Sequence, residues 1–347
     1  MNDFATRIVT WAQAHGRHDL PWQRSPTPYR VWLSEIMLQQ TQVQTVIPYF
    51  ERFTASFPDV AALAAAELDE VLHLWSGLGY YSRARNLHAA ARHVVSEHDG
   101  VFPATLEALV TLPGIGRSTA AAILALAHDI PAAILDGNVK RVLARYHAES
   151  GWPGKTAALD RLWAHAEDHL PPQHARAYTQ ALMDLGATLC TRTRPDCPRC
   201  PLESDCAARR SSMPTAYPGK RPRRTLPERR TCFLIISNDA GHVLLERRPP
   251  HGIWGGLWCF PEIDDATQLA ARLEAFGLSR EMEPVALATI SHTFTHFRLT
   301  IEPIALRARQ LDAAVQEQDD RLWYSSGDST RIGLSAPVTR LLATVET

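Results

Sequence analysis

The spacing of apolar residues divides the chain into two parts that differ in secondary structure. From about residue 4 to residue 190, apolar side chains recur three and four positions apart, as in residues 59–79 and 106–116. This period predicts α-helices, because 3.6 residues complete one helical turn. Prolines such as Pro48 and Pro103 mark breaks between the predicted helices. The first part is therefore predicted to be all-α.

The pattern changes at Thr231. Residues 231–239 and 241–248 are predicted to form two strands around an Asn-Asp-Ala-Gly turn, and residues 283–306 a second pair of strands. Between them, residues 268–278 have the apolar spacing of a helix. This second part is predicted to be α+β.

Two unusual segments lie between these parts and complete the predicted domain organisation. Residues 190–206 form a Pro-containing loop with four cysteines, and residues 207–230 hold four prolines without apolar periodicity, as a linker does. We predict an all-α domain over 1–206, a linker over 207–230 and an α+β domain over 231–347. A length of 347 residues suits two domains, each with its own core.

Composition agrees with a globular protein and adds one feature. Hydrophobic residues make up 45% of the chain, charged residues 21%, and the net charge is −1. No apolar run approaches the ~20 residues of a membrane span, and the N-terminus lacks the pattern of a secretory signal. We therefore expect a cytoplasmic, monomeric protein without membrane contact. Residues 207–230 contain eight Lys or Arg and one acidic residue, which suits either a contact with a polyanion or a solvated linker.

The four cysteines predict a metal centre. Cys190, Cys197, Cys200 and Cys206 have the spacing C-x6-C-x2-C-x5-C. Four thiols this close, in a chain without a secretion signal, favour metal ligation over disulfides. Zinc and a [4Fe–4S] cluster both accept four cysteines; the presence of one C-x2-C pair instead of two favours the cluster. The remaining cysteines, 232 and 259, lie in apolar surroundings and are predicted to be packing residues.

Residues 112–145 contain the second candidate site. The sequence LPGIG places Gly114 and Gly116 just before a predicted helix, where free backbone N–H groups and the helix dipole favour a phosphate. Asp136 follows twenty residues after Gly116, before Gly-Asn. We expect the turn to hold a DNA backbone and Asp136 to face the reacting nucleotide, although Asp-Gly-Asn is also a common helix cap.

Taken together, LPGIG, Asp136 and the cysteine loop resemble the helix-hairpin-helix DNA glycosylases of the endonuclease III type, over about residues 5–206. The resemblance implies that the four cysteines hold a [4Fe–4S] cluster. Within that superfamily the chain resembles the MutY-type adenine DNA glycosylases, which remove adenine opposite 8-oxoguanine. The sequences that carry this resemblance are LPWQ at 20–23, WLSEIMLQQTQV at 32–43, GLGYYSRARNL at 77–87 and LDGNVKRVLAR at 135–145.

The resemblance assigns two carboxyl groups to the chemistry. Glu35 lies in an apolar helical stretch, where partial burial would keep it protonated, and it would act as the general acid at adenine N7. Asp136 would stay ionised and stabilise an oxocarbenium-like sugar. Ser118 stands where strand-cleaving relatives carry a lysine; since a hydroxyl forms no imine, we expect base removal without strand cleavage.

The resemblance also implies contacts with duplex DNA that contains A:8-oxoG or A:G mispairs. Flipping out adenine leaves a gap and an orphan base. The predicted contacts are Trp22 and Arg24 in the adenine pocket, Gln40 and Thr41 at the duplex, Leu78 and Tyr80 beside 8-oxoguanine, Gly114 and Gly116 on phosphate, and Asn138 supporting the loop of Asp136.

The α+β part resembles the Nudix-related domain that follows the cluster in this family. A catalytic Nudix box needs a glutamate-rich helix that binds magnesium, and here only Glu274 remains in that helix. The resemblance instead implies recognition of 8-oxoguanine by Phe294, Thr295 and His296. Three other functions stay open on the sequence: an endonuclease III-like pyrimidine glycosylase/lyase, a non-catalytic DNA-binding protein with a structural cluster, and a Nudix hydrolase.

Overall fold

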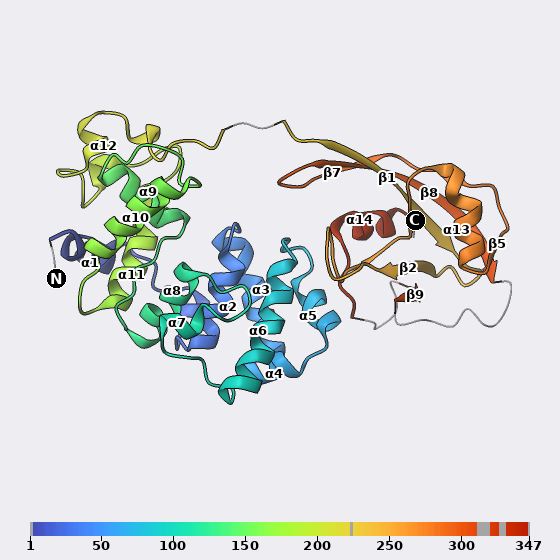
Figure 1. The fold of residues 1–347 in the computed structure, drawn as a ribbon, viewed down its shortest axis with the longest axis horizontal. Coiled ribbons are helices and arrows are strands. Elements are labelled where there is room, and N and C mark those ends of the chain that lie inside the picture. Colours follow the sequence, from blue (N-terminus) through green and yellow to red (C-terminus); the bar gives the residue numbers. More distant parts are fainter. Residues whose placement is uncertain (1–2, 223–224, 311–319, 326–330, 346–347) are drawn as a thin grey trace. The chain divides into compact units, whose positions relative to one another are not determined.

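A computed structural model describes residues 3–222, 225–310, 320–325 and 331–345 (Figure 1). The chain separates into two compact units. The helical unit consists of Met1–Ala65 and Asn86–Arg223, and the sheet unit consists of Ala66–Arg85 and Arg224–Thr347. Residues 66–85, which precede the LPGIG turn in sequence, thus belong to the same compact unit as the C-terminal strands.

The helical unit is built from short helices joined by tight turns. Its elements are α1 Asp3–His15, η1 Pro21–Gln23, α2 Pro28–Leu38, α3 Val43–Ser56, α4 Val60–Ala65, the greater part of α6 Ser82–His98, α7 Leu106–Leu109, α8 Arg117–His128, α9 Gly137–Tyr146, α10 Thr156–Asp168, α11 Ala175–Asp184, a π turn Leu185–Leu189, η3 Cys197–Arg199, α12 Ala207–Arg210 and η4 Pro214–Ala216. The predicted all-α first part is confirmed, although Pro48, predicted to mark a break, lies inside α3.

Helices α2 and α8 form the centre of this unit. The side chain of Thr27 caps α2 by accepting a hydrogen bond from the Arg30 N–H, and Pro28 occupies the first turn, where no N–H is needed. Helix α8 is Ala-rich and buried from Thr119 to Leu126, so that α2 and α11 can approach it closely. The large buried side chains of this core include Trp32, Phe50 and Phe53.

The sheet unit contains a mixed sheet, and the predicted α+β second part is confirmed. Its described strands run in the order β3-β2-β1-β8-β5, with β1 parallel to β8 and antiparallel to β2. The elements are α5 Leu68–Trp75, the start of α6, β1 Glu228–Ser237, β2 Val243–Arg247, β3 Trp258–Cys259, β4 Glu262–Ile263, η5 Ala266–Gln268, α13 Leu269–Ala275, β5 Leu278–Arg280, β6 Val285–Ala286, β7 Ile290–Thr293, β8 Arg298–Gln310, β9 Arg321–Tyr324 and α14 Ala336–Val345.

Both faces of strand β1 are covered, which explains its continuous apolar sequence. Leu234 and Ile236 pack in a core with Leu273 and Phe276, at the end of α13. Phe233, which points to the opposite face, lies 6.2 Å from the Trp254 ring, centroid to centroid. Figure 1 shows α13 beside β8 and the long β7–β8 hairpin that extends from the sheet.

The segment predicted to be a linker has more structure than its composition indicates. It contains α12, η4 and the first residues of β1, and Ala208 is buried; residues 223–224 lie outside the described range. Within the helical unit, the Tyr217 carbonyl accepts a hydrogen bond from Arg145, and the Gly219 N–H donates one to the Gly151 carbonyl. Cys232 and Cys259 are both buried, as expected of packing residues.

Candidate active site

The turn between α7 and α8 needs its first glycine for a steric reason. Gly114 has φ +75°, and a Cβ atom there would lie 2.8 Å from the Asn86 Cβ. Gly116 caps α8, and a Cβ atom there would meet nothing within 4 Å. The turn therefore presents an open surface at the N-terminus of a twelve-residue helix, as a backbone phosphate requires.

Asp136 begins the next helix. Its Oδ1 accepts a hydrogen bond from the Val139 N–H at 2.7 Å, which caps α9, and its Oδ2 accepts one from Asn138 Nδ2 at 3.1 Å. The predicted cap and the predicted support from Asn138 thus coexist on one carboxylate. These two bonds fix the orientation of the carboxylate. The same carboxylate belongs to a residue that lines a pocket.

Glu35 projects from α2, between buried neighbours on both sides. Burial, with the nearby negative charge of Asp136 as the second cause, raises the pKa of its carboxyl to about 8. Glu35 is therefore protonated at neutral pH. This is the state in which a carboxyl can donate a proton, and it is the property that the sequence predicted for this residue.

A single cavity of about 920 Å³ brings these groups together; we call it the carboxylate pocket. Seven of the predicted site residues line it: Trp22, Glu35, Gln40, Thr41, Ser118, Asp136 and Asn138. The Ser118 Oγ accepts a hydrogen bond from the Leu135 N–H at 3.0 Å, so this hydroxyl holds the residue before Asp136. The described lining contains no lysine.

Arg24 is not among the lining residues. Its side chain is exposed and donates to the Asp19 carbonyl at 3.4 Å. Gly114 and Gly116 also lie outside the pocket lining, on the α7–α8 turn. Glu35 and Asp136 thus line one pocket, whereas Gly114 and Gly116 lie outside that pocket, on the α7–α8 turn.

Sequence reasoning missed several polar residues of this pocket, among them Arg17, Gln180 and Arg141. Arg17 and Gln180 both donate to the buried carboxylate of Asp184, from Arg17 Nη2 at 2.6 Å and Gln180 Nε2 at 2.9 Å. An acidic residue in a run of buried apolar positions, here Asp184 in α11, is the sequence signal that could have indicated this network.

Arg141 links Asp136 to the cysteine loop. Its Nη2 donates to Asn138 Oδ1 at 2.9 Å, and its Nε donates to the Cys190 carbonyl at 2.7 Å. One turn later the buried Arg145 donates to the Cys190 Sγ at 3.2 Å and to the Thr191 carbonyl at 2.8 Å. Helix α9 therefore carries Asp136 at its N-terminus and orders the first cysteine through two arginines.

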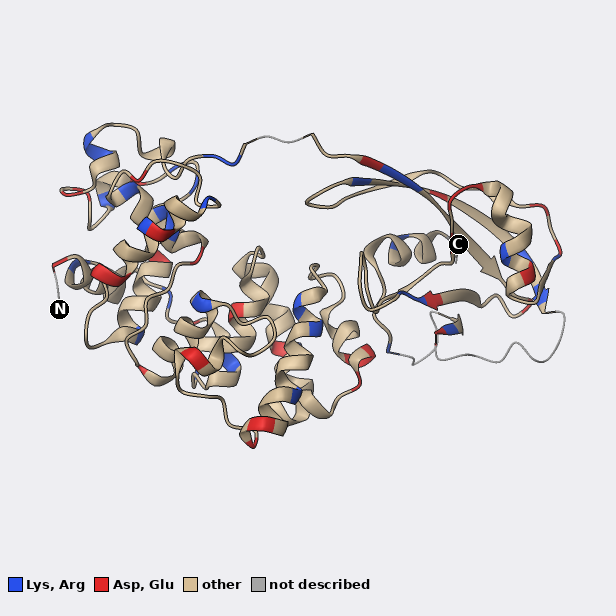
Figure 2. Ribbon diagram, in the orientation of Figure 1, with Lys and Arg blue, Asp and Glu red and all other residues tan. Residues whose placement is uncertain are grey.

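The four predicted metal ligands line one pocket, together with apolar residues of α9 and the π turn. Among the described residues, no three His, Cys, Asp or Glu side chains converge on the position of a single metal ion. The thiols of Cys190, Cys197, Cys200 and Cys206 surround the pocket instead. Figure 2 shows basic residues on α9 and α12, the helices on either side of this loop.

A second cavity, of about 390 Å³, lies within the sheet unit; we call it the aromatic pocket. Four predicted contact residues line it: Tyr80, Phe294, Thr295 and His296. The sequence missed Trp254 and His292, whose rings lie 5.2 Å and 4.6 Å from the Phe294 ring. Leu78 is buried and does not line this pocket.

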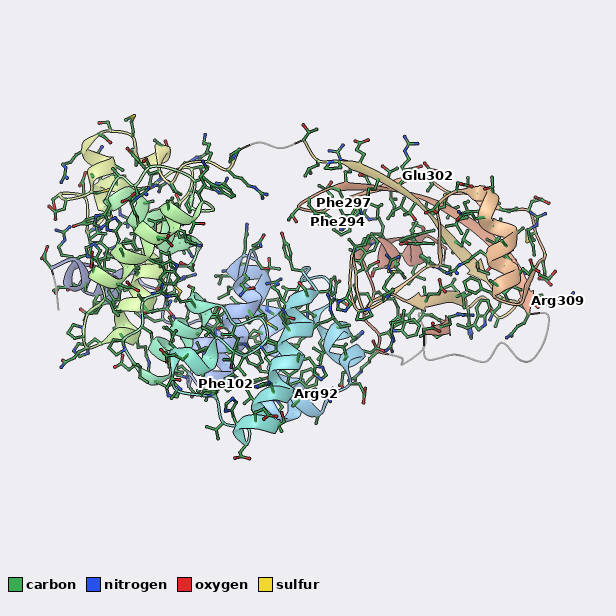
Figure 3. The ribbon with its side chains drawn as sticks, in the orientation of Figure 1. Arg92, Phe102, Phe294, Phe297, Glu302 and Arg309 are labelled. Atoms are coloured by element: carbon green, nitrogen blue, oxygen red, sulfur yellow. The ribbon has the colours of Figure 1, made fainter. Side chains whose placement is uncertain are left out.

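The tip of the β7–β8 hairpin is an ordered turn. The Phe294 N–H donates to the Phe297 carbonyl at 2.9 Å, and the two rings stack 4.6 Å apart. Figure 3 shows both rings together at the tip. Thr295 and His296 are the exposed central residues of the turn. Phe294 thus stands between Phe297 on one side and Trp254 with His292 on the other.

Comparison with known proteins identifies the family. Residues 33–167 match the HhH-GPD superfamily of base excision DNA repair proteins, and residues 231–344 match the NUDIX domain. Over 339 residues the chain is 38% identical to the adenine DNA glycosylase of Buchnera aphidicola subsp. Acyrthosiphon pisum, and the alignment covers 98% of this chain and 96% of that protein. The chain belongs to the adenine DNA glycosylase family.

Other adenine DNA glycosylases and related structures agree. The adenine DNA glycosylase of Homo sapiens is 35% identical over 364 residues, which cover 87% of this chain and 66% of the human protein. The structure of a thermostable thymine-DNA glycosylase is 28% identical, with a TM-score of 0.55, over 60% of this chain and 95% of that one. An endonuclease III in a non-covalent DNA complex, 20% identical, shares the fold with a TM-score of 0.51 over 60% of this chain and 94% of its own.

These matches confirm the predicted family and both predicted folds, the helix-hairpin-helix glycosylase fold and the Nudix-like fold. An adenine DNA glycosylase is a base-excision repair enzyme, so the chain is an enzyme. The alternative hypothesis of a non-catalytic DNA-binding protein is therefore excluded. Among the described residues, no helix has the length and apolarity that a membrane crossing requires.

Proposed function

We propose that this enzyme hydrolyses the N-glycosidic bond of adenine opposite 8-oxoguanine in duplex DNA, and also acts on A:G and A:C mispairs. The observation that carries the proposal is the meeting, in one pocket, of Glu35 with a pKa of about 8 and a second carboxyl, Asp136. Two carboxyl groups with different roles suit the cleavage of a bond between a sugar and a poor leaving group.

Glu35 is the general acid in this mechanism. Adenine leaves more easily when N7 is protonated, and a carboxyl that is neutral at pH 7 can supply that proton. The buried surroundings of Glu35 on α2 raise its pKa and so keep the carboxyl protonated. After base departure, the resulting carboxylate can help to activate the water that attacks the sugar.

Asp136 stabilises the positive charge that develops on the sugar as the bond breaks. Its carboxylate is already held by the Val139 N–H and by Asn138, so it need not reorient during the reaction. Arg141, which bonds to Asn138, holds this arrangement from behind.

The enzyme removes the base without cleaving the strand. An imine needs an amine near the sugar carbon, and Ser118 offers a hydroxyl that already accepts the Leu135 N–H. This argues against the endonuclease III-like lyase reaction.

DNA is bound by two surfaces in this proposal. Gly114 and Gly116 contact a phosphate, while Gln40 and Thr41 approach the duplex beside the flipped adenine, which enters a pocket walled by Trp22. Arg24 is exposed and lies outside that pocket lining, and in this proposal it contacts the DNA backbone.

The base opposite adenine is recognised by the aromatic pocket. Tyr80 stacks on 8-oxoguanine, and Phe294, Thr295 and His296 supply a wedge, a hydroxyl and an imidazole, whereas the buried Leu78 makes no contact with the base. The described part of α13 has a single glutamate, Glu274, so this domain reads an oxidised guanine and does not hydrolyse pyrophosphates.

Cys190, Cys197, Cys200 and Cys206 hold a [4Fe–4S] cluster. The fit rests on four thiols that line one small pocket. When bound, the cluster crosslinks the loop 190–206, which Arg141 and Arg145 tie to the helix of Asp136. The domain boundaries at 206 and 231, a monomeric state and a cytoplasmic location stay predictions.

The test is an assay of adenine release from A:8-oxoG, A:G and A:C duplexes, with and without alkali. We expect fastest release from A:8-oxoG, and strand breaks only after alkali. Breaks without alkali, or efficient borohydride trapping on DNA with oxidised pyrimidines, would contradict the proposal. Pyrophosphate release from an oxidised nucleotide would contradict the role given to the Nudix-like domain.

A further inference from the structure

Tyr80 adopts a costly backbone conformation at the aromatic pocket. Its φ is +49°, in the left-handed region that side chains other than glycine rarely adopt, and its side chain is 43% exposed. An exposed ring on such a turn keeps its orientation only if surrounding groups fix it. The interactions around Tyr80 show what fixes it.

Arg83, at the start of α6, makes these interactions. It is 8% exposed, although guanidinium groups are rarely buried to this degree. Its Nη2 donates to the Leu78 carbonyl at 3.3 Å and to the Gly79 carbonyl at 3.1 Å. Its Cζ lies 5.5 Å from the centroid of the Tyr80 ring. One guanidinium thus contacts both the backbone before Tyr80 and the Tyr80 ring.

Trp75 completes the arrangement. Its Nε1–H donates to the same Gly79 carbonyl at 3.1 Å, and its ring lies 5.4 Å from the Arg83 Cζ. The Arg83 N–H in turn donates to the Tyr80 carbonyl at 2.8 Å, which closes the turn. The guanidinium therefore contacts two aromatic rings and two backbone carbonyls at once, which a planar cation with several donors suits and a lysine ammonium does not reproduce.

From these contacts we infer that Arg83 is a positioning residue for Tyr80: it fixes the turn 78–80 and the tyrosine ring, so that the ring is already oriented for stacking on the base opposite adenine. Arg83 touches neither the base nor a phosphate in this arrangement. The inference rests on the proposed role of Tyr80 in recognising that base.

A double-mutant cycle tests the inference. The variants are Arg83→Met, Arg83→Lys, Tyr80→Leu and the double variant Tyr80→Leu/Arg83→Met, with Arg92→Met as the matched control, an exposed arginine on the same helix. Affinity is measured on duplexes with 2′-fluoro-2′-deoxyadenosine, which resists cleavage, opposite 8-oxoguanine or guanine. Single-turnover rates of adenine release are measured at saturating enzyme on the ordinary A:8-oxoG duplex.

We expect Arg83→Met to weaken binding to the 8-oxoguanine duplex by about tenfold, as loss of one aromatic–base stack does. The saturating rate should stay within about threefold of wild type, because the carboxylate pocket is unchanged. In the Tyr80→Leu background, Arg83→Met should have no further effect on affinity. Arg83→Lys should restore part of the loss, and Arg92→Met should bind as wild type does.

The salt dependence of binding separates positioning from a direct phosphate contact. Loss of a phosphate contact makes the slope of log K against log salt less negative by about 0.9, whereas loss of a positioning residue leaves the slope unchanged. Thermal unfolding checks that each variant is folded. Where Arg83→Met does not fold, Arg83→Lys takes its place in the cycle.

The outcomes distinguish this inference from the proposed function. If Tyr80→Leu lowers affinity for the 8-oxoguanine duplex but Arg83→Met does not, or if the two losses are additive, the role of Arg83 is overturned while that of Tyr80 stands. A reduced salt slope also overturns it. If the wild-type enzyme releases no adenine from A:8-oxoG, the proposed function itself fails.

Discussion

The carboxylate pocket of the helical unit and the aromatic pocket of the sheet unit hold different kinds of side chain. The first combines Glu35, Asp136 and a hydroxyl, with burial that raises the pKa of one acid. The second combines the rings of Trp254, His292 and Phe294, which pack against one another, with Tyr80 in the same pocket lining. A proton-transfer site needs charge in a low-dielectric setting, whereas a base-reading site needs rigid flat surfaces.

The comparison teaches that the two pockets should fail in different ways. Damage to the carboxylate pocket should change the rate of adenine release and leave the choice of partner base intact. Damage to the aromatic pocket should change the choice of partner base and leave the saturating rate intact. Four variants test this division, beginning with the largest expected effect.

Glu35→Gln should lower the single-turnover rate on A:8-oxoG by about 10³-fold, because the amide cannot donate the acid proton. Affinity for the 2′-fluoro duplex should be retained, since the amide keeps the size of the side chain. The matched control is Glu51→Gln, on the exposed surface of α3, which should react as wild type does. A Glu35→Gln rate within tenfold of wild type would exclude Glu35 as the acid.

Asp136→Asn should lower the rate by about 10²-fold, since an amide stabilises the sugar cation poorly but still accepts the capping hydrogen bond. The same variant should move the pH profile. In the wild type, activity falls as pH rises through the Glu35 pKa of about 8, where the acid loses its proton.

Removing the Asp136 charge removes one cause of that raised pKa, so the midpoint of the falling limb should shift to lower pH in Asp136→Asn. A pH–rate series on the two enzymes measures the shift. A midpoint that stays in place or moves upward would mean that the two carboxyl groups are not coupled.

Phe294→Ala should reduce the preference for 8-oxoguanine over guanine by about tenfold, measured as the ratio of the two affinities. The control is Ser291→Ala, on the opposite face of β7 and outside the pocket lining. If Phe294→Ala instead lowers the saturating rates equally on all duplexes, the proposed division of roles between the two pockets is contradicted.

Thr295→Ala should have the smallest effect, a loss of preference of about threefold, the size of one exposed hydrogen bond. Thr295→Ser keeps the hydroxyl and should retain the preference. If Thr295→Ser loses as much as Thr295→Ala, the methyl group and not the hydroxyl contacts the base.

Motifs in the sequence predicted seven residues of the carboxylate pocket lining, Glu35 and Asp136 among them. Ser118 lies in the first turn of α8, and Asp136 directly precedes α9. Only one helix and one short loop separate the two residues, so their proximity is a local property of the chain. The cap formed by Asp136 is a local interaction and was expected. The Asp184 network was missed, since its partners come from helices far apart in the sequence.

The aromatic pocket was harder to predict. Phe294, Thr295 and His296 followed from the motif HTFTHF at 292–297, which also contains His292 without assigning it a role, but Trp254 had no such signal. Nor did the sequence indicate that residues 66–85 belong to the sheet unit, which puts Tyr80 beside Phe294 in one pocket. That grouping depends on long-range contacts such as the one from the Tyr81 hydroxyl to the Leu334 carbonyl.

The sequence by itself determined the helical and α+β parts, the family, and the identities of Glu35 and Asp136, because periodicity and motifs are local properties of the chain. Only the tertiary structure decided which groups raise the pKa of Glu35, the exposure of Arg24 and the placement of Arg83 against Tyr80. Burial and charge at a side chain depend on elements that are distant in sequence, and folding alone brings them together.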